Sequence, residues 1–305
     1  IKGVGPRYCP SIEGKITTFY DKPRHQLFLE PETKDGDSIY IQGFATSMPR
    51  DVQEQMARSL PGFENAEILK YGYAIEYDAI VPTQFDATLR VKKYRGLYGA
   101  GQICGTSGYE EAAGLGIMAG INAVLAIRGQ APLILKRNEA YIAVMIDDLV
   151  TKGAIEPYRL LSSRAEYRLL LRHVNADLRL TEYGYQLGLI PESRYQSFLQ
   201  KNESLNRVLS ILRKTYLGAN KKVNEYLLKI GCTPLKGGTL AYDLLKRPDV
   251  AYSTMIELIP ELIFHPLDET GIMQLEIMVK YEGYIAKQEK EAKSFAKFES
   301  LLLPE

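Results

Sequence analysis

Cys9 lies among residues that could make a thiol reactive. It stands in the run Gly-Pro-Arg-Tyr-Cys-Pro, where glycine and proline break regular secondary structure and Arg7 brings a cation close in sequence. A neighbouring cation favours the thiolate, which is the nucleophilic form of cysteine. The other interpretation is a small residue buried in a tight turn. On composition alone that interpretation is favoured, because most free cysteines are simply packed.

Arginines recur at four-residue intervals at Arg164, Arg168 and Arg172. Ser163 and Glu166 have the S-x-x-E spacing of a capping box, which predicts a helix with all three guanidinium groups on one face. Residues 151–216 contain eleven Lys and Arg against six Asp and Glu, a local excess of five in a chain of formal net charge +1. Such a face suits binding to a phosphate backbone. The alternative, of equal weight, is an ion-pair network with three acids: Glu156, Glu166 and Asp177.

A glycine-rich stretch, residues 97–122, predicts a buried strand, a tight turn and a long helix. Ser107 and Glu110 form another S-x-x-E pair, which places the helix start just after the turn. The N–H groups at such a helix end suit a phosphate or an electron-rich ring. Small residues recur every fourth position at Ala112, Gly116 and Gly120. One helix face is therefore nearly bare, and either a cofactor or a tightly packed sheet explains it equally well.

Other elements must position these residues. Residues 25–31 and 39–44 predict strands, and Pro49 opens a helix that Pro61-Gly62 ends. Residues 88–93 and 97–101 are expected to form two further strands.

Beyond Gly129 the composition changes to long polar and aliphatic helices, which marks a domain boundary near Ala131-Pro132. Apolar residues at heptad-like steps predict a helix from Pro191 to about Tyr216. Residues 218–238 are expected to form a loop-rich connection, and a second long helix is expected over residues 271–301.

The three cysteines, Cys9, Cys104 and Cys232, lie far apart without a C-x-x-C pair, so we predict reduced thiols and no disulfide or metal site. No apolar run reaches ~18 residues and no signal peptide opens the chain, which predicts a cytoplasmic protein without a membrane contact. The chain begins at Ile1 rather than methionine, so we interpret it as a fragment.

Three strings of residues identify a family. They are Gly-Pro-Arg-Tyr-Cys-Pro-Ser-Ile-Glu at 5–13, Ala-Gly-Gln followed by Gly-Tyr-Glu-Glu-Ala-Ala within 100–113, and the segment from Glu156-Pro-Tyr-Arg to Leu180. The chain resembles, over essentially all of its length, the glucose-inhibited division protein A (MnmG/GidA) family of flavin-dependent tRNA uridine modification enzymes.

The resemblance implies an α/β plus α fold. It comprises part of a two-dinucleotide-binding (FAD and NAD(P)) Rossmann-like flavoprotein, followed by a mostly helical domain. Residues 1–80 are expected to belong to an inserted NAD-binding-like domain, residues 81–130 to the carboxy-terminal part of the FAD-binding domain, and residues 131–305 to a helical domain for tRNA or partner binding. The family's first phosphate loop, G-x-G-x-x-G, is absent from this sequence and is expected upstream. The family also continues beyond Pro304 into a small helical tail.

The resemblance also implies the site residues. Cys9 matches the family's essential cysteine, whereas Cys104 is interpreted as incidental. Flavin contact is carried onto Gln102, with Gly101, Gly108, Tyr109 and Glu110 around it. Binding of tRNA is assigned to Arg164, Arg168 and Arg172. The nicotinamide dinucleotide segment comprises Gly5, Pro6, Arg7, Tyr8, Cys9, Pro10, Ser11, Ile12, Glu13, Gly14, Lys15, Ile16, Thr17, Thr18 and Phe19. Gly14 stands where relatives usually have an acidic residue.

The implied reaction adds an aminomethyl or carboxymethylaminomethyl group to carbon 5 of the wobble uridine in tRNA. It uses FAD, NADH and a carbon from methylene-tetrahydrofolate. The implied partners are a second copy of the chain, in a homodimer, and the GTPase MnmE, in a heterotetramer with two of each. One alternative is a folate- and FAD-dependent tRNA uracil-5-methyltransferase, which lacks the long helical domain. Another is a non-catalytic, tRNA-binding scaffold on a flavin fold.

Overall fold

The computed structural model describes residues 10–36, 38–73 and 77–299. Its contacts divide the chain into two compact units. The first unit comprises residues 1–134 and 145–160, and the second comprises residues 135–144 and 161–305.

The first unit opens with helix α1 (Ile12–Thr18), strands β1 (Phe28–Pro31) and β2 (Ile39–Gln42), and helix α2 (Arg50–Arg58). The strands pair antiparallel, with Phe28 opposite Gln42. Both predicted strands are confirmed, although each is shorter than expected. The predicted helix after Pro49 is also confirmed, because Pro49 is the N-cap of α2 and the helix ends before Pro61.

The glycine-rich part of the first unit contains two 3₁₀ turns, η1 (Pro82–Gln84) and η2 (Gly101–Cys104), and the long helix α3 (Tyr109–Ile127). The two strands predicted over 88–93 and 97–101 are wrong, since isolated bridges, Phe85 with Val91 and Arg90 with Tyr98, occur instead. The cause is local: Leu89 and Gly96 have positive φ, so the chain reverses instead of extending.

The predicted capping box at Ser107 and Glu110 is also wrong. The N-cap of α3 is Gly108, and no side chain caps this helix end. The acidic residue at the third helical position is therefore Glu111. Helix α3 is long and apolar enough to span a membrane by length and composition, but this is weak evidence, because the core helix of a globular protein passes the same test.

Helix α4 (Tyr141–Asp147) runs into a π-helical turn, η3 (Asp148–Lys152), at the start of the chain's return to the first unit. In the second unit, two short turns, η4 (Ser162–Arg164) and η5 (His173–Asn175), precede helix α5 (Ala176–Gln186). The long helix α6 (Glu192–Lys214) follows, with Pro191 as its N-cap.

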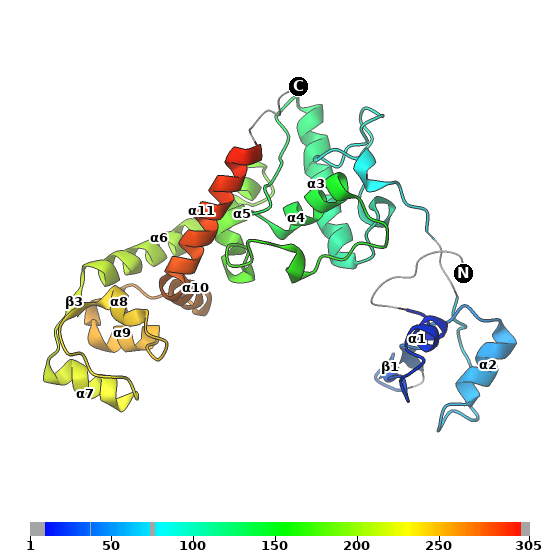
Figure 1. Ribbon diagram of the computed structural model, residues 1–305, viewed down its shortest axis with the longest axis horizontal. Coiled ribbons are helices and arrows are strands. Elements are labelled where there is room, and N and C mark those ends of the chain that lie inside the picture. Colours follow the sequence, from blue (N-terminus) through cyan, green and yellow to red (C-terminus); the bar gives the residue numbers. More distant parts are fainter. Residues whose placement is uncertain (1–9, 37, 74–76, 300–305) are drawn as a thin grey trace. The chain divides into compact units, whose positions relative to one another are not determined.

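The rest of the second unit is helical apart from one pair of short strands (Figure 1). Its elements are β3 (Tyr216–Leu217), α7 (Lys221–Lys229), β4 (Thr239–Leu240), α8 (Ala241–Leu245), α9 (Tyr252–Leu258), η6 (Pro260–Phe264), α10 (Glu269–Lys280) and α11 (Glu282–Glu299). Leu212, Leu227, Leu245, Leu275 and Val279 are completely buried in one apolar core.

The helices of the second unit agree only in part with those predicted from the sequence. The helix from Pro191 is confirmed, and it ends at Lys214 just before Tyr216 enters β3. Residues 218–238, expected to be loop-rich, contain α7. The helix expected over 271–301 is two helices divided at Tyr281. Glu282, directly after the break, accepts a 2.9 Å hydrogen bond from the Tyr242 hydroxyl and pairs with Lys246 at 2.9 Å. These contacts hold the start of α11 in place.

Candidate functional site

The turn before α3 depends on glycines. Gly101 and Gly105 have φ values of 78° and 84°, in the left-handed region that residues with a side chain rarely adopt. Gly101 is buried, and a Cβ built on it would lie 3.5 Å from the Cβ of Ala112 in α3. The turn is therefore folded tightly against the first part of the helix.

A buried carboxylate lies at the amino end of α3. Glu111 is only 3% exposed, its Oε1 accepts a 2.8 Å hydrogen bond from the Leu160 N–H, and Arg159 pairs with it at 3.4 Å. A Cβ built on Gly108 would lie 1.7 Å from Glu111 Oε2, so only glycine leaves room for this carboxylate. Negative charge is favourable at a helix amino end because of the helix dipole.

Residues 105–111 are held in place by the returning segment 148–160. The Tyr158 N–H donates to the Gly105 carbonyl at 2.8 Å, and the Ser107 N–H donates to the Tyr158 carbonyl at 3.2 Å. The Tyr158 hydroxyl donates to the buried Asp148 carboxylate at 2.9 Å, and Lys152 pairs with the same carboxylate at 2.7 Å. The turn is thus supported by hydrogen bonds from a segment about fifty residues later in the chain.

Sequence reasoning recognised residues 156–159 and 108–113 as separate strings but did not pair them. The two segments are joined by a parallel bridge between Thr106 and Tyr158, about fifty residues apart in the chain. The spacing of apolar residues along the chain reports only local structure, so it does not predict this pairing. The sequence offered one signal for the pairing: opposite charges in the two strings, Glu111 in one and Arg159 in the other.

Four side chains near the turn are exposed. Gln102 and Glu110 lie on the surface, as do Tyr109 (94% exposed) and Ile103 (40% exposed). Cys104 between them is buried, and burial raises the pKa of its thiol to about 11. A protonated, buried thiol is a poor nucleophile at neutral pH, which agrees with its interpretation as an incidental residue.

The face of α3 that the sequence predicted to be bare is open in the described residues. A Cβ built on Gly116 or Gly120 meets no atom within 4 Å. Their neighbours Ile117 and Val124 are 52% and 45% exposed. The alternative interpretation, a tight sheet contact on this face, is therefore not found in the part of the chain that the structure describes.

Part of the predicted nicotinamide segment, Gly5 to Cys9, lies outside the described residues, and so does the predicted catalytic thiol. The remainder, from Pro10 to Phe19, contains α1, with Ser11 as its N-cap and Phe19 as its C-cap. Glu13 accepts hydrogen bonds from the Thr46 hydroxyl and from the Ser47 N–H. Burial raises the pKa of Glu13, whereas these hydrogen bonds, with others from Ser11 and the backbone, lower it. The hydrogen bonds together have the larger effect, so the pKa of Glu13 lies below its ordinary value. This carboxylate therefore stays ionised and ties α1 to residues 46–47.

The predicted helix with a stripe of arginines is wrong. Arg164 ends a 3₁₀ turn, and residues 165–172 contain no α-helix. Arg168 is exposed, whereas Arg172 is half-buried, donates to the Leu169 carbonyl, and has its pKa lowered by burial. Two acids of the predicted ion-pair alternative pair with cations outside the predicted stripe, because Glu166 pairs with Arg137 at 2.6 Å and Asp177 with Lys201 at 2.9 Å.

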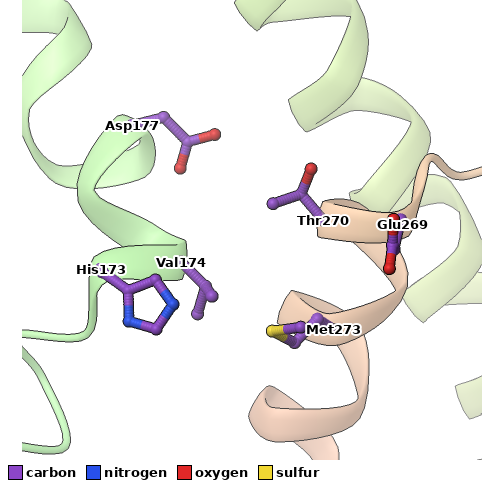
Figure 2. A pocket seen from close by; sticks show the side chains of 6 residues that line it. All are labelled: His173, Val174, Asp177, Glu269, Thr270 and Met273. Carbon is purple, nitrogen blue, oxygen red and sulfur yellow. The ribbon is translucent and has the colours of Figure 1, made fainter. Parts of the chain in front are cut away.

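The second unit contains a cavity of about 360 Å³ between the start of α5 and the start of α10 (Figure 2). Figure 2 shows His173, Val174 and Asp177 on one side and Glu269, Thr270 and Met273 on the other. Asp177 is already bound to Lys201 and to Gln274. Within residues 10–36, 38–73 and 77–299, no group of three His, Cys, Asp or Glu is placed to hold a metal ion.

Two protein-family models match the sequence. The model described as glucose inhibited division protein A matches residues 1–131, and the one described as tRNA modifying enzyme MnmG/GidA C-terminal helical domain matches residues 192–289.

Curated relatives include the tRNA uridine 5-carboxymethylaminomethyl modification enzymes MnmG of Exiguobacterium sibiricum and Lacticaseibacillus paracasei. They are 55% and 56% identical over 305 residues, and each alignment covers 100% of this chain and 48% of the relative. The chain thus spans about half the length of the curated relatives it matches.

Solved structures of Aquifex aeolicus GidA also resemble the chain. The form II crystal structure has a TM-score of 0.79 at 40% identity and covers 99% of this chain and 47% of that chain. The form I structure has a TM-score of 0.78 at 42% identity, with 100% and 47% covered. The described residues therefore have the fold of GidA with its helical carboxy-terminal domain.

Proposed function

Because the chain belongs to the glucose-inhibited division protein A family, we propose that it is part of an FAD- and NADH-dependent enzyme that modifies tRNA. The reaction adds an aminomethyl or carboxymethylaminomethyl group to carbon 5 of the wobble uridine, with methylene-tetrahydrofolate as carbon donor. The observation that carries the proposal is the glycine turn before α3, which leaves a helix amino end and the side chain of Gln102 open.

The residues at this turn fit a flavin. Ala112 and Glu111 lie against Gly101 and Gly108, so these glycines let the turn fold closely onto α3. The first-turn N–H groups of α3 at Tyr109 and Glu110 suit an electron-rich ring or a phosphate. Gln102 would donate or accept a hydrogen bond, since its amide does both. When bound, the flavin supplies hydride transfer. The Glu111 carboxylate and the segment 158–160 keep the turn in shape.

Residues 5–19 are proposed to bind the nicotinamide dinucleotide, and Cys9 is proposed as the catalytic thiol. Carbon 5 of uracil is a poor nucleophile. Addition of the Cys9 thiolate to carbon 6 would place electron density on carbon 5, which gives that cysteine a chemical purpose.

The proposed function also implies a domain arrangement for the chain. Residues 1–80 belong to the inserted NAD-binding-like domain, residues 81–130 to a Rossmann-like FAD domain and residues 131–305 to a helical domain that meets tRNA through Arg164, Arg168 and Arg172. The assembly is a cytoplasmic homodimer that joins the GTPase MnmE. Of the three arginines, Arg168 is the most available to a phosphate, because it is exposed.

Mass spectrometry of tRNA nucleosides from a strain lacking the gene tests the proposal. Loss of the 5-substituted wobble uridine supports it, and loss of 5-methyluridine instead indicates the methyltransferase alternative. An unchanged set of nucleosides indicates a non-catalytic scaffold. Returning the gene with Cys9→Ser should fail to restore the modification while the protein keeps its flavin, because a serine hydroxyl is a far weaker nucleophile at neutral pH.

A further inference from the structure

We propose that the exposed loop Lys92–Gly96 of the first unit, which precedes the glycine turn in the chain, is a contact surface for RNA phosphates. This proposal rests on the proposed function, because it identifies where the tRNA of that reaction is held. The loop is distinct from the predicted arginine segment of the second unit.

The loop has a fixed shape because both of its arms are bonded. The Val91 N–H donates to the Leu97 carbonyl at 2.8 Å, and the Gly99 N–H donates to the Leu89 carbonyl at 2.9 Å. Leu89 and Val91 are buried, at 1% and 5% exposure, so the base of the loop belongs to the core of the unit. Gly96 closes the turn with a φ of 79°.

The loop is strongly cationic. Residues 87–109 contain four Lys and Arg and no Asp or Glu. Arg90 pairs with Asp86 at 3.1 Å, and the Lys92 ammonium donates to the Thr83 carbonyl at 2.8 Å. Lys93 and Arg95 remain exposed, and no carboxylate of the described residues lies within 4.0 Å of either. Two cations are therefore available to an anionic partner.

An aromatic ring lies between these cations. Tyr94 is 55% exposed, and the Lys93 ammonium lies 5.8 Å from the centre of its ring. Cations that bind phosphates, together with an aromatic ring on which a base can stack, are the combination that single-stranded RNA requires. An acidic protein surface would use the cations but not the stacking, which is why we favour RNA.

The position of the loop connects it to the candidate site. Its second arm, from Leu97, runs directly into Gly101 and Gln102. A Cβ built on Gly99 would lie 2.4 Å from the Phe85 ring, so this arm is packed closely on the core. RNA held by Lys93 and Arg95 is thereby bound to the same unit as the proposed flavin turn, separated from it in the chain by residues 97–100.

The test uses the full-length polypeptide, with its flavin, and unmodified tRNA. Lys93→Gln with Arg95→Gln should lower the slope of log affinity against log salt by about two and weaken binding about tenfold at moderate salt. The matched control is Lys287→Gln with Lys290→Gln, which removes two exposed lysines from α11, a helix with four lysines and four glutamates. The control should bind tRNA like the wild type.

A second pair of variants tests the stacking. Tyr94→Ala should weaken tRNA binding, and Tyr94→Phe should bind nearly as well as the wild type, because phenylalanine keeps the ring. Equal tRNA affinity for both would overturn the stacking role.

Three results would overturn the proposal for the cations. The first is a salt dependence of tRNA binding in the Lys93/Arg95 double variant that equals that of the wild type. The second is an equal loss of tRNA affinity in the α11 control, which indicates a general charge effect. The third is loss of flavin or a raised KM for NADH with unchanged tRNA affinity, which would assign the cations to cofactor phosphates. If the wild type itself binds no tRNA, the proposed function fails with it, whereas a wild-type slope in the double variant leaves that function standing.

Discussion

The two long helices, α3 in the first unit and α6 in the second, are held by different forces. On α6, Leu205, Val208 and Leu212 are at most 1% exposed within an apolar core that neighbouring helices complete. On α3, Ile117 and Ile127 are 52% and 86% exposed, so a large part of its apolar surface is uncovered in the described residues. Length and apolar composition therefore do not show how a helix is fixed in place.

Buried polar contacts help to fix α3, in addition to its buried apolar residues Leu115 and Met118. Asn122, only 1% exposed, exchanges hydrogen bonds with the backbone of Leu133 at 2.8 and 3.1 Å, and Glu111 holds the amino end against Leu160. A satisfied buried polar group contributes little net free energy, but leaving its partner unpaired is costly. We therefore expect the second unit to respond to lost volume and the first unit to lost pairing.

The largest effect is expected in the apolar core of the second unit. Leu227 in α7 is fully buried, and Leu227→Ala should lower the free energy of unfolding by about 2 to 5 kcal/mol, because it removes buried methyl groups and leaves a cavity. Urea unfolding of the full-length protein measures it. The next residue, Leu228, is 59% exposed, so Leu228→Ala is the control. Equal losses in the two variants would show that burial on α7 is not what stabilises this unit.

The second effect concerns pairing in the first unit. Glu111→Ala should cost about 1 to 3 kcal/mol, because the Leu160 N–H loses its acceptor and the ion pair with Arg159 is removed. Glu110→Ala, at an exposed position one residue earlier, should cost far less. Proteolysis between residues 153 and 160 reports whether the supporting segment has come loose. If the two alanine variants are equally stable, the buried carboxylate does not fix the turn.

The third comparison sets two glycines of the same helix against each other. Gly108→Ala should destabilise the first unit by about 1 to 3 kcal/mol, because its Cβ would meet Glu111 Oε2 and force the side chain to move. Gly116→Ala should be neutral or stabilising by about 0.5 to 1 kcal/mol, because nothing lies near its Cβ and alanine favours a helix. Thermal unfolding of the two variants gives the sign. A loss of stability in Gly116→Ala would mean that an occupant absent from the described residues covers this face.

The sequence predicted best where one local pattern determined the structure. The heptad-like steps after Pro191 and the proline before α2 gave helices that begin where expected, because helix periodicity and N-cap chemistry are local properties. The glycine turn was located by its own short sequence string, residues 100–113, which is also a local pattern.

The predicted arginine helix failed because distant residues compete for its backbone groups. The Leu169 N–H donates to the Gln288 side chain at 3.1 Å, and Gln288 donates to the Glu166 carbonyl at 3.3 Å. Hydrogen bonds to a residue more than a hundred positions away replace the i to i+4 ladder, and no capping-box pattern records them. The support of the glycine turn by Tyr158 was missed for the same reason.

The smallest effect concerns the buried cysteines, one in each unit. The Cys232 thiol donates to the Asp249 carbonyl at 3.4 Å, whereas burial alone raises the pKa of Cys104 to about 11. A folded-state pKa above the unfolded value near 9 means that the thiol contributes fully to stability below pH ~9 and that this contribution is lost as the pH rises through about 11. Cys104→Ala should therefore leave the pH dependence of unfolding unchanged from pH 6 to 8 and reduce the decline between pH ~9 and ~11.

The alanine also removes some packing, which lowers the melting temperature at every pH. The measured quantity is therefore the change of the melting temperature with pH in each protein. Cys232→Ala, from the second unit, is the control for the loss of packing that follows removal of a buried thiol. An undiminished decline in Cys104→Ala would assign the alkaline loss to other groups, such as the buried Tyr252, whose pKa is also raised by burial. The Cys104 side chain would then be a packing residue without a titration linked to folding.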